Sequence, residues 1–126
     1  MLMQRSPHEA YRRVDFDARV EGADSRHLVQ LCYEQLIGAL GSAIFAQAKG
    51  DNLLKSQSLT RALSAITALQ LGVSGESGMA TALRTLYEAA RKSILDSALK
   101  FDAAMLERIR ADFVDISQAT RAAQQA

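Results

Sequence analysis

The side chains best suited to chemistry in this chain are few: one cysteine and two histidines. Cys32, His8 and His27 do not follow the spacing of a zinc site, and a single cysteine cannot form a disulfide within the chain. A histidine phosphotransfer bundle exposes its histidine near the middle of a helix beside a lysine, whereas His27 follows Arg26 at an expected helix start. We therefore expect no catalytic residue and no bound metal.

Two further patterns are candidates for ion binding. The stretch GVSGESG at 72–78 lacks the Lys-Ser/Thr pair that a P-loop places on phosphates and magnesium, and no strand precedes it. Asp15, Asp17 and Glu21 could chelate a cation, but their spacing lacks the glycine and the terminal glutamate of an EF-hand loop. The first pattern indicates an interhelical loop and the second indicates solvated charges, so no cofactor is expected.

Length and composition bound the class of protein. A chain of 126 residues with 48% hydrophobic and 23% charged residues is typical of one soluble globular domain. With 15 Lys+Arg against 14 Asp+Glu it has no basic excess for binding nucleic acid. No uninterrupted apolar run approaches the roughly 20 residues of a membrane span, and the N-terminus lacks the apolar core of a signal peptide. We expect a cytoplasmic protein that does not insert into a membrane.

The elements that must position any site are helices. Only one proline occurs, and no stretch alternates apolar with polar residues over the length of a strand. Glycines interrupt the chain near 50 and at 72–78, and the resulting prediction is an all-α, antiparallel up-down four-helix bundle. We expect an N-terminal arm at 1–23, flexible or with a short extra helix, then helices at about 25–49, 52–71, 78–99 and 102–122 within a bundle at 24–122, and a C-terminal tail at 123–126.

Helical phase assigns an apolar stripe to each of the last three helices. The stripes are Leu59, Ala62, Leu63, Ile66 and Leu69; Met79, Leu83, Leu86, Tyr87, Ala90, Ile94 and Ala98; and Met105, Leu106, Ile109, Phe113, Ile116 and Thr120. We expect these stripes to form the core, together with Cys32 of the first helix.

The first helix is apolar over about half of its circumference, which is wider than one bundle face requires. Beyond that arc, Leu31 and Phe45 flank the small residues Gly38, Gly41 and Ser42. We expect Leu31 and Phe45 to be exposed and this side to form a shallow groove that accepts another helix. Two alternatives remain: the N-terminal arm covers the groove, or the groove pairs with a second copy in a homodimer.

The order of several motifs resembles the flagellin-specific export chaperone family, FliS. Ala10-Tyr11, a polar spacer and then the segment LVQLCYE at 28–34 are similar to the family's N-terminal signature. LTRA at 59–62 resembles its Leu-Ser-Lys-Ala, and Leu83-x-x-Leu86-Tyr87-Glu88 resembles a second Leu-Tyr-Asp motif. The match extends over about residues 10–120 in one register.

The resemblance implies a non-enzymatic chaperone that binds the C-terminal segment of flagellin in apolar grooves, prevents its premature polymerisation and delivers it to the export apparatus. A homo-oligomeric structural bundle or an adaptor without flagellin specificity is the alternative. Tyr33, part of the signature, joins Leu31, Gly38, Ser42 and Phe45 as a candidate partner-binding residue.

The N-terminal arm supplies the last candidates. Tyr11 has an aromatic body and a polar tip, so it can pack on an apolar surface while its hydroxyl stays hydrogen-bonded. Val14 and Phe16 are close enough in sequence to extend that contact. We expect Tyr11 and Val14 to take part in controlling the groove.

Overall fold

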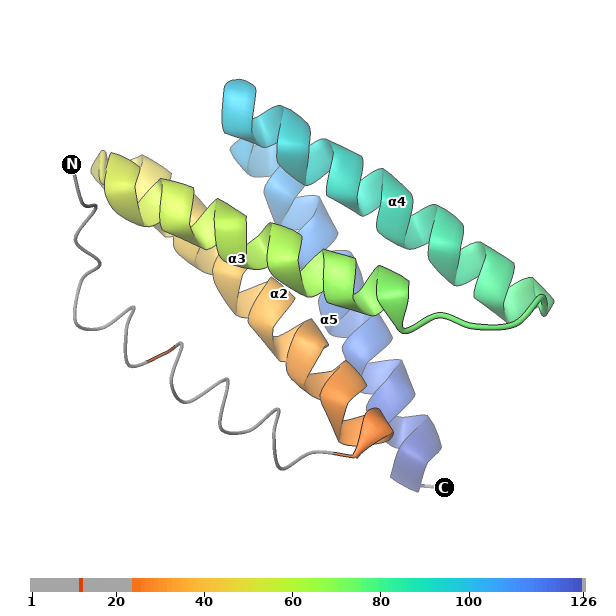
Figure 1. Cartoon of the computed structure of the whole chain (residues 1–126). Coiled ribbons are helices and arrows are strands. Elements are labelled where there is room, and N and C mark those ends of the chain that lie inside the picture. The colour runs from red at the N-terminus through yellow and green to blue at the C-terminus, as the bar shows by residue number, and fades with distance from the viewer. Residues whose placement is uncertain (1–11, 13–23, 126) are drawn as a thin grey trace.

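Four long helices form the part of the chain that the structure describes. The computed structural model describes residue 12 and residues 24–125. The helices are α2 (Ser25–Lys49), α3 (Asn52–Leu71), α4 (Gly78–Leu99) and α5 (Ala103–Gln125), packed antiparallel in chain order (Figure 1). The prediction of an all-α, antiparallel four-helix bundle is confirmed.

Short polar side chains set the starts of the helices. Asp24, Asp51 and Ser77 each accept a hydrogen bond from the backbone N–H three residues later, at 2.9, 3.0 and 3.1 Å. Asp102 does the same for Met105 at 3.0 Å. These bonds satisfy N–H groups that have no partner within the first turn, so the starts agree with the sequence pattern to within one residue.

The C-terminal ends of α2 and α5 depend on which backbone conformations their residues favour. Gly50 ends α2 at φ 72°, a left-handed conformation that side chains with a Cβ atom rarely adopt. The end of α5 differs from the prediction, because the helix continues to Gln125 through residues expected in a tail. Alanine and glutamine are good helix formers, and neither glycine nor proline interrupts 122–125.

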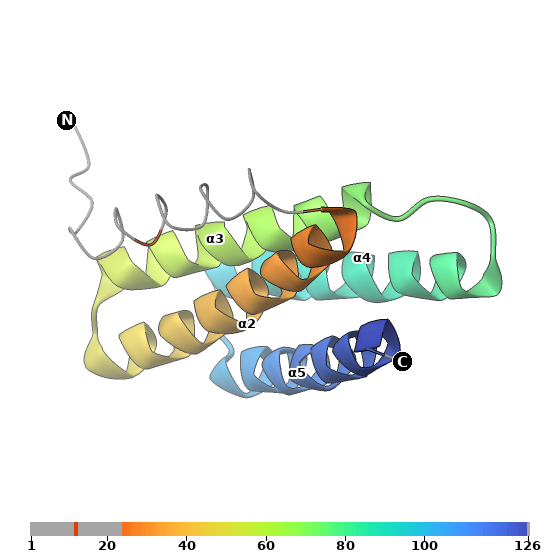
Figure 2. The same cartoon turned by 90° about the horizontal axis from the view of Figure 1, so that it is seen from below.

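The helix α2 occupies the centre of the packing. It lies between α3 and α5, as Figure 2 shows, whereas α4 packs on α3 and less extensively on α5. The backbones of α2 and α4 do not approach each other. Fully buried small residues, including Ala39, Ala43 and Ala62, let helices come close together where α2 meets α3.

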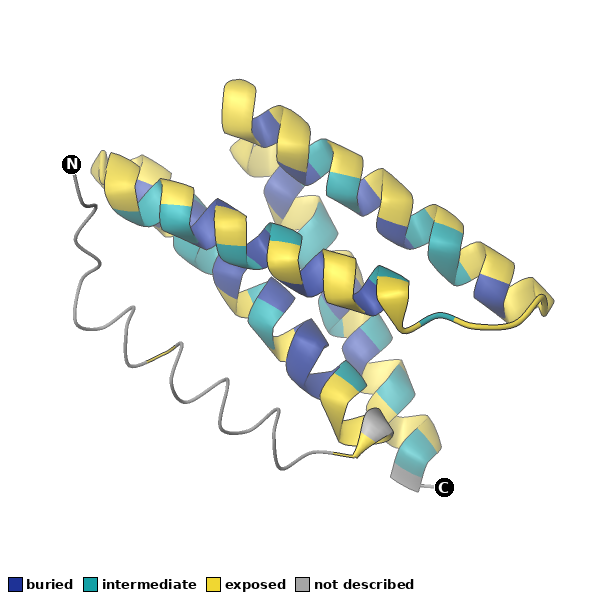
Figure 3. Ribbon diagram, viewed as in Figure 1, coloured by how far each residue is buried: buried dark blue, intermediate teal, exposed yellow. Residues whose placement is uncertain are grey.

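The core gathers on the sides of the helices that face one another (Figure 3). Phe113 of α5 is fully buried between the rings of Tyr33 and Tyr87, each with its centroid 6.1 Å away. The two tyrosine hydroxyl oxygens lie 2.7 Å apart, at hydrogen-bonding distance. Burial raises the pKa of Tyr87, and the hydrogen bond to Tyr33 raises it further, so this hydroxyl stays neutral.

Most of the predicted core positions are buried or packed against the core, including Cys32, Ile66, Leu83 and Phe113. Met79 and Ala98 lie exposed on α4, and Met105 and Thr120 of α5 are only half-buried. In the first turn of α4, Ala80 takes the buried position beside Met79. Both exposed residues lie near the ends of α4. The apolar pattern of the sequence continues there, but few residues of the other helices lie opposite to cover it.

The composition of α2 also matches a membrane span. Residues Arg26–Lys49 are long and apolar enough for one, judged by length and composition. The same segment supplies Leu36, Leu40 and other core residues. A central core helix therefore accounts for this apolar character.

We expect Phe113→Ala to lower the free energy of unfolding by about 3 to 5 kcal/mol, since it removes a fully buried ring and leaves a cavity beside two tyrosines. Leu71→Ala is the matched control, because its side chain is 83% exposed and the change should stay within about 0.5 kcal/mol. Urea unfolding followed by circular dichroism measures both. Similar losses in the two variants would contradict this assignment of the core.

Candidate partner-binding surface

One side of α2 faces away from the core and carries most of the sequence-predicted groove. We call the line formed by Leu31, Gly38, Ser42 and Phe45 the outer face of α2; their spacing of seven, four and three residues keeps them on one side of the helix. Phe45 is 57% exposed, Gly38 is exposed and Ser42 is half-buried. The C-terminal half of this face is therefore accessible.

Gly38 forms an open floor in the middle of the outer face. A Cβ atom added there would meet nothing within 4 Å. A glycine inside a helix costs roughly 0.5–1 kcal/mol relative to alanine, and no neighbour in the described structure requires its small size. What the glycine does provide is a place where the backbone of another segment can approach α2 closely.

Gly41 lies on the flank of this floor nearest α5. A Cβ atom at Gly41 would lie 3.9 Å from Cδ of Arg110, an ordinary van der Waals distance. The Arg110 guanidinium in turn donates to Glu107 from Nε at 2.8 Å, and this hydrogen bond lowers the pKa of Glu107. The border of the outer face along α5 is thus charged.

Phe45 carries a cation over its exposed ring. The Nζ atom of Lys49 lies 5.7 Å from the ring centroid, within the range of a cation–π interaction. An exposed contact of this kind contributes about 0.5–1 kcal/mol. An apolar group of a partner could therefore replace Lys49 on the ring at small cost. The spacing of four residues in a helix could have indicated this pair from the sequence.

The expectation that Leu31 is exposed is wrong. Its side chain is 6% exposed, although it does not belong to the main core cluster. Helical phase predicts on which side of α2 a residue lies, but it does not predict whether another part of the molecule covers that side. The outer face is covered at Leu31 and open at Phe45.

Tyr33 also differs from the sequence prediction. It is 3% exposed and its ring packs near Phe113, so a partner on the surface of this structure would not touch it. Its place in the signature is explained by the hydrogen bond with Tyr87 in the core. An aromatic residue with a polar tip fits both a buried core and a partner-binding surface, and only the packing of the folded chain distinguishes the two.

A residue of the N-terminal arm lies on the outer face. The Arg12 guanidinium donates from an Nη atom to Oγ of Ser42 at 3.3 Å, across 30 positions of sequence. Tyr11 and Val14, the arm residues selected from the sequence, lie outside the described residues. The sequence did not indicate a role for Arg12. An arginine in a charged segment has no feature that predicts a hydrogen bond to one particular distant hydroxyl.

No group of three or more His, Cys, Asp or Glu that could hold a metal occurs among residues 24–125 together with residue 12. Cys32 is buried, and desolvation raises the pKa of its thiol. A buried neutral thiol is a poor nucleophile. What this surface can do is bind another segment through an exposed ring, a glycine floor and polar borders.

The four-helix bundle thus leaves one side of its central helix open at Gly38 and Phe45. The family model described as flagellar protein FliS matches residues 7–126, so the chain belongs to this family. The flagellar secretion chaperone FliS of Salmonella typhimurium (strain LT2) is 27% identical over 114 residues, which cover 88% of this chain and 84% of that relative. Because FliS proteins are chaperones, the expectation of a protein without enzymatic activity is confirmed.

Gly38 and Gly50 give opposite expectations for the same substitution. We expect Gly38→Ala to raise the free energy of unfolding by about 0.5–1 kcal/mol, because the added methyl group meets open space and alanine favours the helix. Gly50→Ala should lower it by about 1 kcal/mol, because φ is 72° there. Thermal and urea unfolding measure both changes. A loss of stability in Gly38→Ala would show that the free chain itself needs this glycine.

Proposed function

We propose that this chain is a cytoplasmic export chaperone that binds the C-terminal segment of flagellin on the outer face of α2. Membership of the FliS family supports this assignment, as does the similarity to the flagellar secretion chaperone of Salmonella. The observation that carries it is the exposed ring of Phe45 beside the open floor at Gly38. Delivery of the bound flagellin to the export apparatus completes the proposed role.

A flagellin segment that is not yet assembled needs a surface that covers its apolar side chains. A segment without its assembly partners exposes apolar side chains that favour premature polymerisation. Folding it as a helix on the chaperone buries those side chains, and the buried area offsets the entropy lost on ordering. The glycine floor lets the two helices approach closely, and Phe45 offers apolar area at one end.

Binding of a second copy to the same face is the competing use of this surface. An exposed ring and a small floor suit a homodimer as well as a foreign helix. Size-exclusion chromatography with light scattering, with and without purified flagellin, distinguishes the two. A monomer that forms a one-to-one complex supports the chaperone, whereas a stable dimer that ignores flagellin supports a structural bundle.

Phe45→Asp should abolish detectable binding of flagellin while the free energy of unfolding changes by less than about 1 kcal/mol, because the side chain is exposed. Leu71→Asp is the matched control: this leucine is also exposed near the C-terminal end of its helix, but it lies outside the outer face of α2. Titration calorimetry and far-UV circular dichroism measure binding and fold. Undiminished binding by Phe45→Asp would move the site elsewhere.

The N-terminal arm is proposed to compete with flagellin for the outer face. The hydrogen bond from Arg12 to Ser42 supports this, because it places a residue of the arm on that face. Arg12 is exposed, so the arm can give up this bond at modest cost. The proposed roles of Tyr11 and Val14 belong to the same competition.

We expect deletion of residues 1–18 to raise the affinity for flagellin several-fold, because a competitor for the outer face is removed. Arg12→Ala should reproduce part of that gain. Titration calorimetry measures both, with circular dichroism to verify that the four helices persist. A fall in affinity would show that the arm clamps the ligand instead, and an unchanged affinity would remove the arm from the mechanism.

A further inference from the structure

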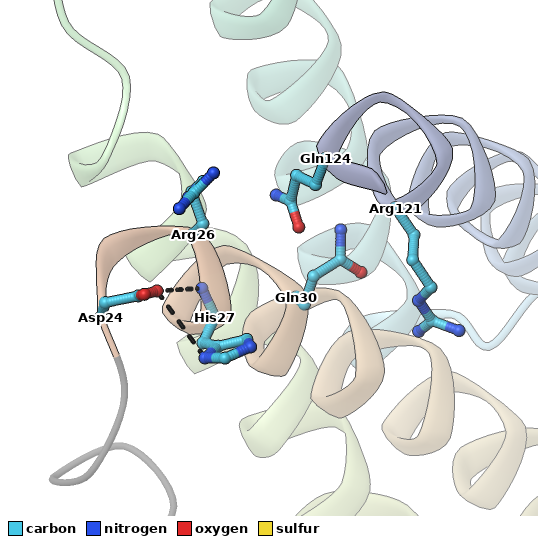
Figure 4. A pocket seen from close by; sticks show the side chains of 6 residues that line it. All are labelled: Asp24, Arg26, His27, Gln30, Arg121 and Gln124. Atoms are coloured by element: carbon cyan, nitrogen blue, oxygen red, sulfur yellow. Dashed lines mark hydrogen bonds and ion pairs between the residues drawn. The ribbon is translucent and has the colours of Figure 1, made fainter. Parts of the chain in front are cut away.

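A polar pocket lies where the start of α2 meets the end of α5 (Figure 4). It is an open depression of about 410 Å³. Its lining consists of Asp24, Arg26, His27, Gln30, Arg121 and Gln124. The chaperone mechanism proposed above does not use any of these residues.

The charges of the pocket favour an anion. Arg26 and Arg121 bring two positive charges, and the N-terminus of α2 adds the positive end of a helix dipole. Asp24 keeps a negative charge in the pocket, because its hydrogen bond from the His27 backbone N–H lowers its pKa, so the two arginines leave one net positive charge there. Arg121 has no hydrogen bond or ion pair with residue 12 or residues 24–125.

Gln30 at the inner side of the pocket has an unused hydrogen-bond donor. The residue is only 8% exposed, and its Oε1 atom accepts a hydrogen bond from Oγ of Ser117 in α5 at 3.1 Å. Its amide nitrogen is buried and has no partner among the described residues. A buried donor without an acceptor is unfavourable, because it has lost its hydrogen bonds to water. An acceptor that enters between the two helix ends would satisfy it.

The pocket lies at the end of α2 opposite Phe45, beyond the covered Leu31. His27 lies one helical turn before Leu31, and Phe45 lies 18 residues after His27, about 27 Å away at 1.5 Å per residue. Gln30 contacts Ser117 of α5, and Gly41 lies next to Arg110 of α5. The pocket and this border of the outer face therefore both lie along the interface between α2 and α5. A bound helix of about 18 residues is long enough to reach from Phe45 to the pocket, and it would have to displace what covers Leu31.

We propose that this pocket binds the terminal α-carboxylate of the flagellin segment and thereby sets its direction along α2. The inference rests on the proposed function, since it names the end of the segment that the chaperone recognises. The guanidinium groups of Arg26 and Arg121 and the amide of Gln30 supply donors for the two carboxylate oxygens. The C-terminal residues of flagellin then lie near His27, and the preceding residues lie toward Phe45.

The test compares two synthetic peptides of the flagellin C-terminal segment that differ only at their last group. One ends in the free carboxylate and the other in a carboxamide, which removes the charge and leaves all side chains unchanged. We expect the wild-type chain to bind the acid about tenfold or more tightly than the amide, with the difference shrinking at high salt. Titration calorimetry at two salt concentrations measures this.

Variants of two arginines on α5 place the effect in the pocket. Arg121→Gln should bind the acid about as weakly as the wild-type chain binds the amide, and should no longer distinguish the peptides. Arg108→Gln is the matched control, because it makes the same change of charge at an exposed position 13 residues earlier on α5, outside the pocket. It should retain the preference for the acid.

The outcomes separate this inference from the proposed function. Equal binding of acid and amide by the wild-type chain would overturn the carboxylate site and leave the chaperone assignment standing, as would a preference that survives in Arg121→Gln. Side-chain carboxylates of the segment would give that equal binding, because both peptides carry them. Failure of both peptides and of intact flagellin to bind would overturn the proposed function itself.

Discussion

The hydrogen bond between Tyr33 and Tyr87 is the interaction on which the rest of this structure depends. The backbones of α2 and α4 do not approach each other, yet their tyrosine hydroxyl oxygens lie 2.7 Å apart beside the ring of Phe113. Loss of either hydroxyl would leave the other buried without its partner, at a cost of about 1–3 kcal/mol. The pair therefore ties α4 to α2, while the packing of α2 on α3 and α5 fixes the rotation that turns Tyr33 into the core.

That rotation decides which residues can meet a partner. With Tyr33 turned into the core, Gly38 and Phe45 lie about 120–140° away around the helix, as 100° per residue requires. They face outward because Tyr33 faces inward. The wide apolar arc of α2 thus supplies the contacts with α3 and α5, and the outer face beyond it stays accessible near Phe45.

The two ends of the outer face offer different chemistry. Near Phe45 the surface presents an aromatic ring beneath an ammonium group, while the other end meets the polar pocket at Arg26 and Arg121. Arg12 adds a contact from the N-terminal arm at Ser42, between these ends. Under the proposed function, an amphipathic segment with a charged terminus would match this polarity in one direction only.

The sequence by itself determined the fold class and the helix starts, because periodicity and capping act within a few residues. Asp24, Asp51 and Ser77 cap wherever the rest of the chain lies, and Gly50 ends α2 through its own backbone angle. Helical phase likewise identified Phe45 and Gly38 as outward-facing. Only the tertiary structure decided that Leu31 is covered, that Tyr33 is paired in the core and that Gln30 and Arg121 share a pocket. Each of these depends on which distant segment lies opposite, and a local pattern carries no information about that neighbour.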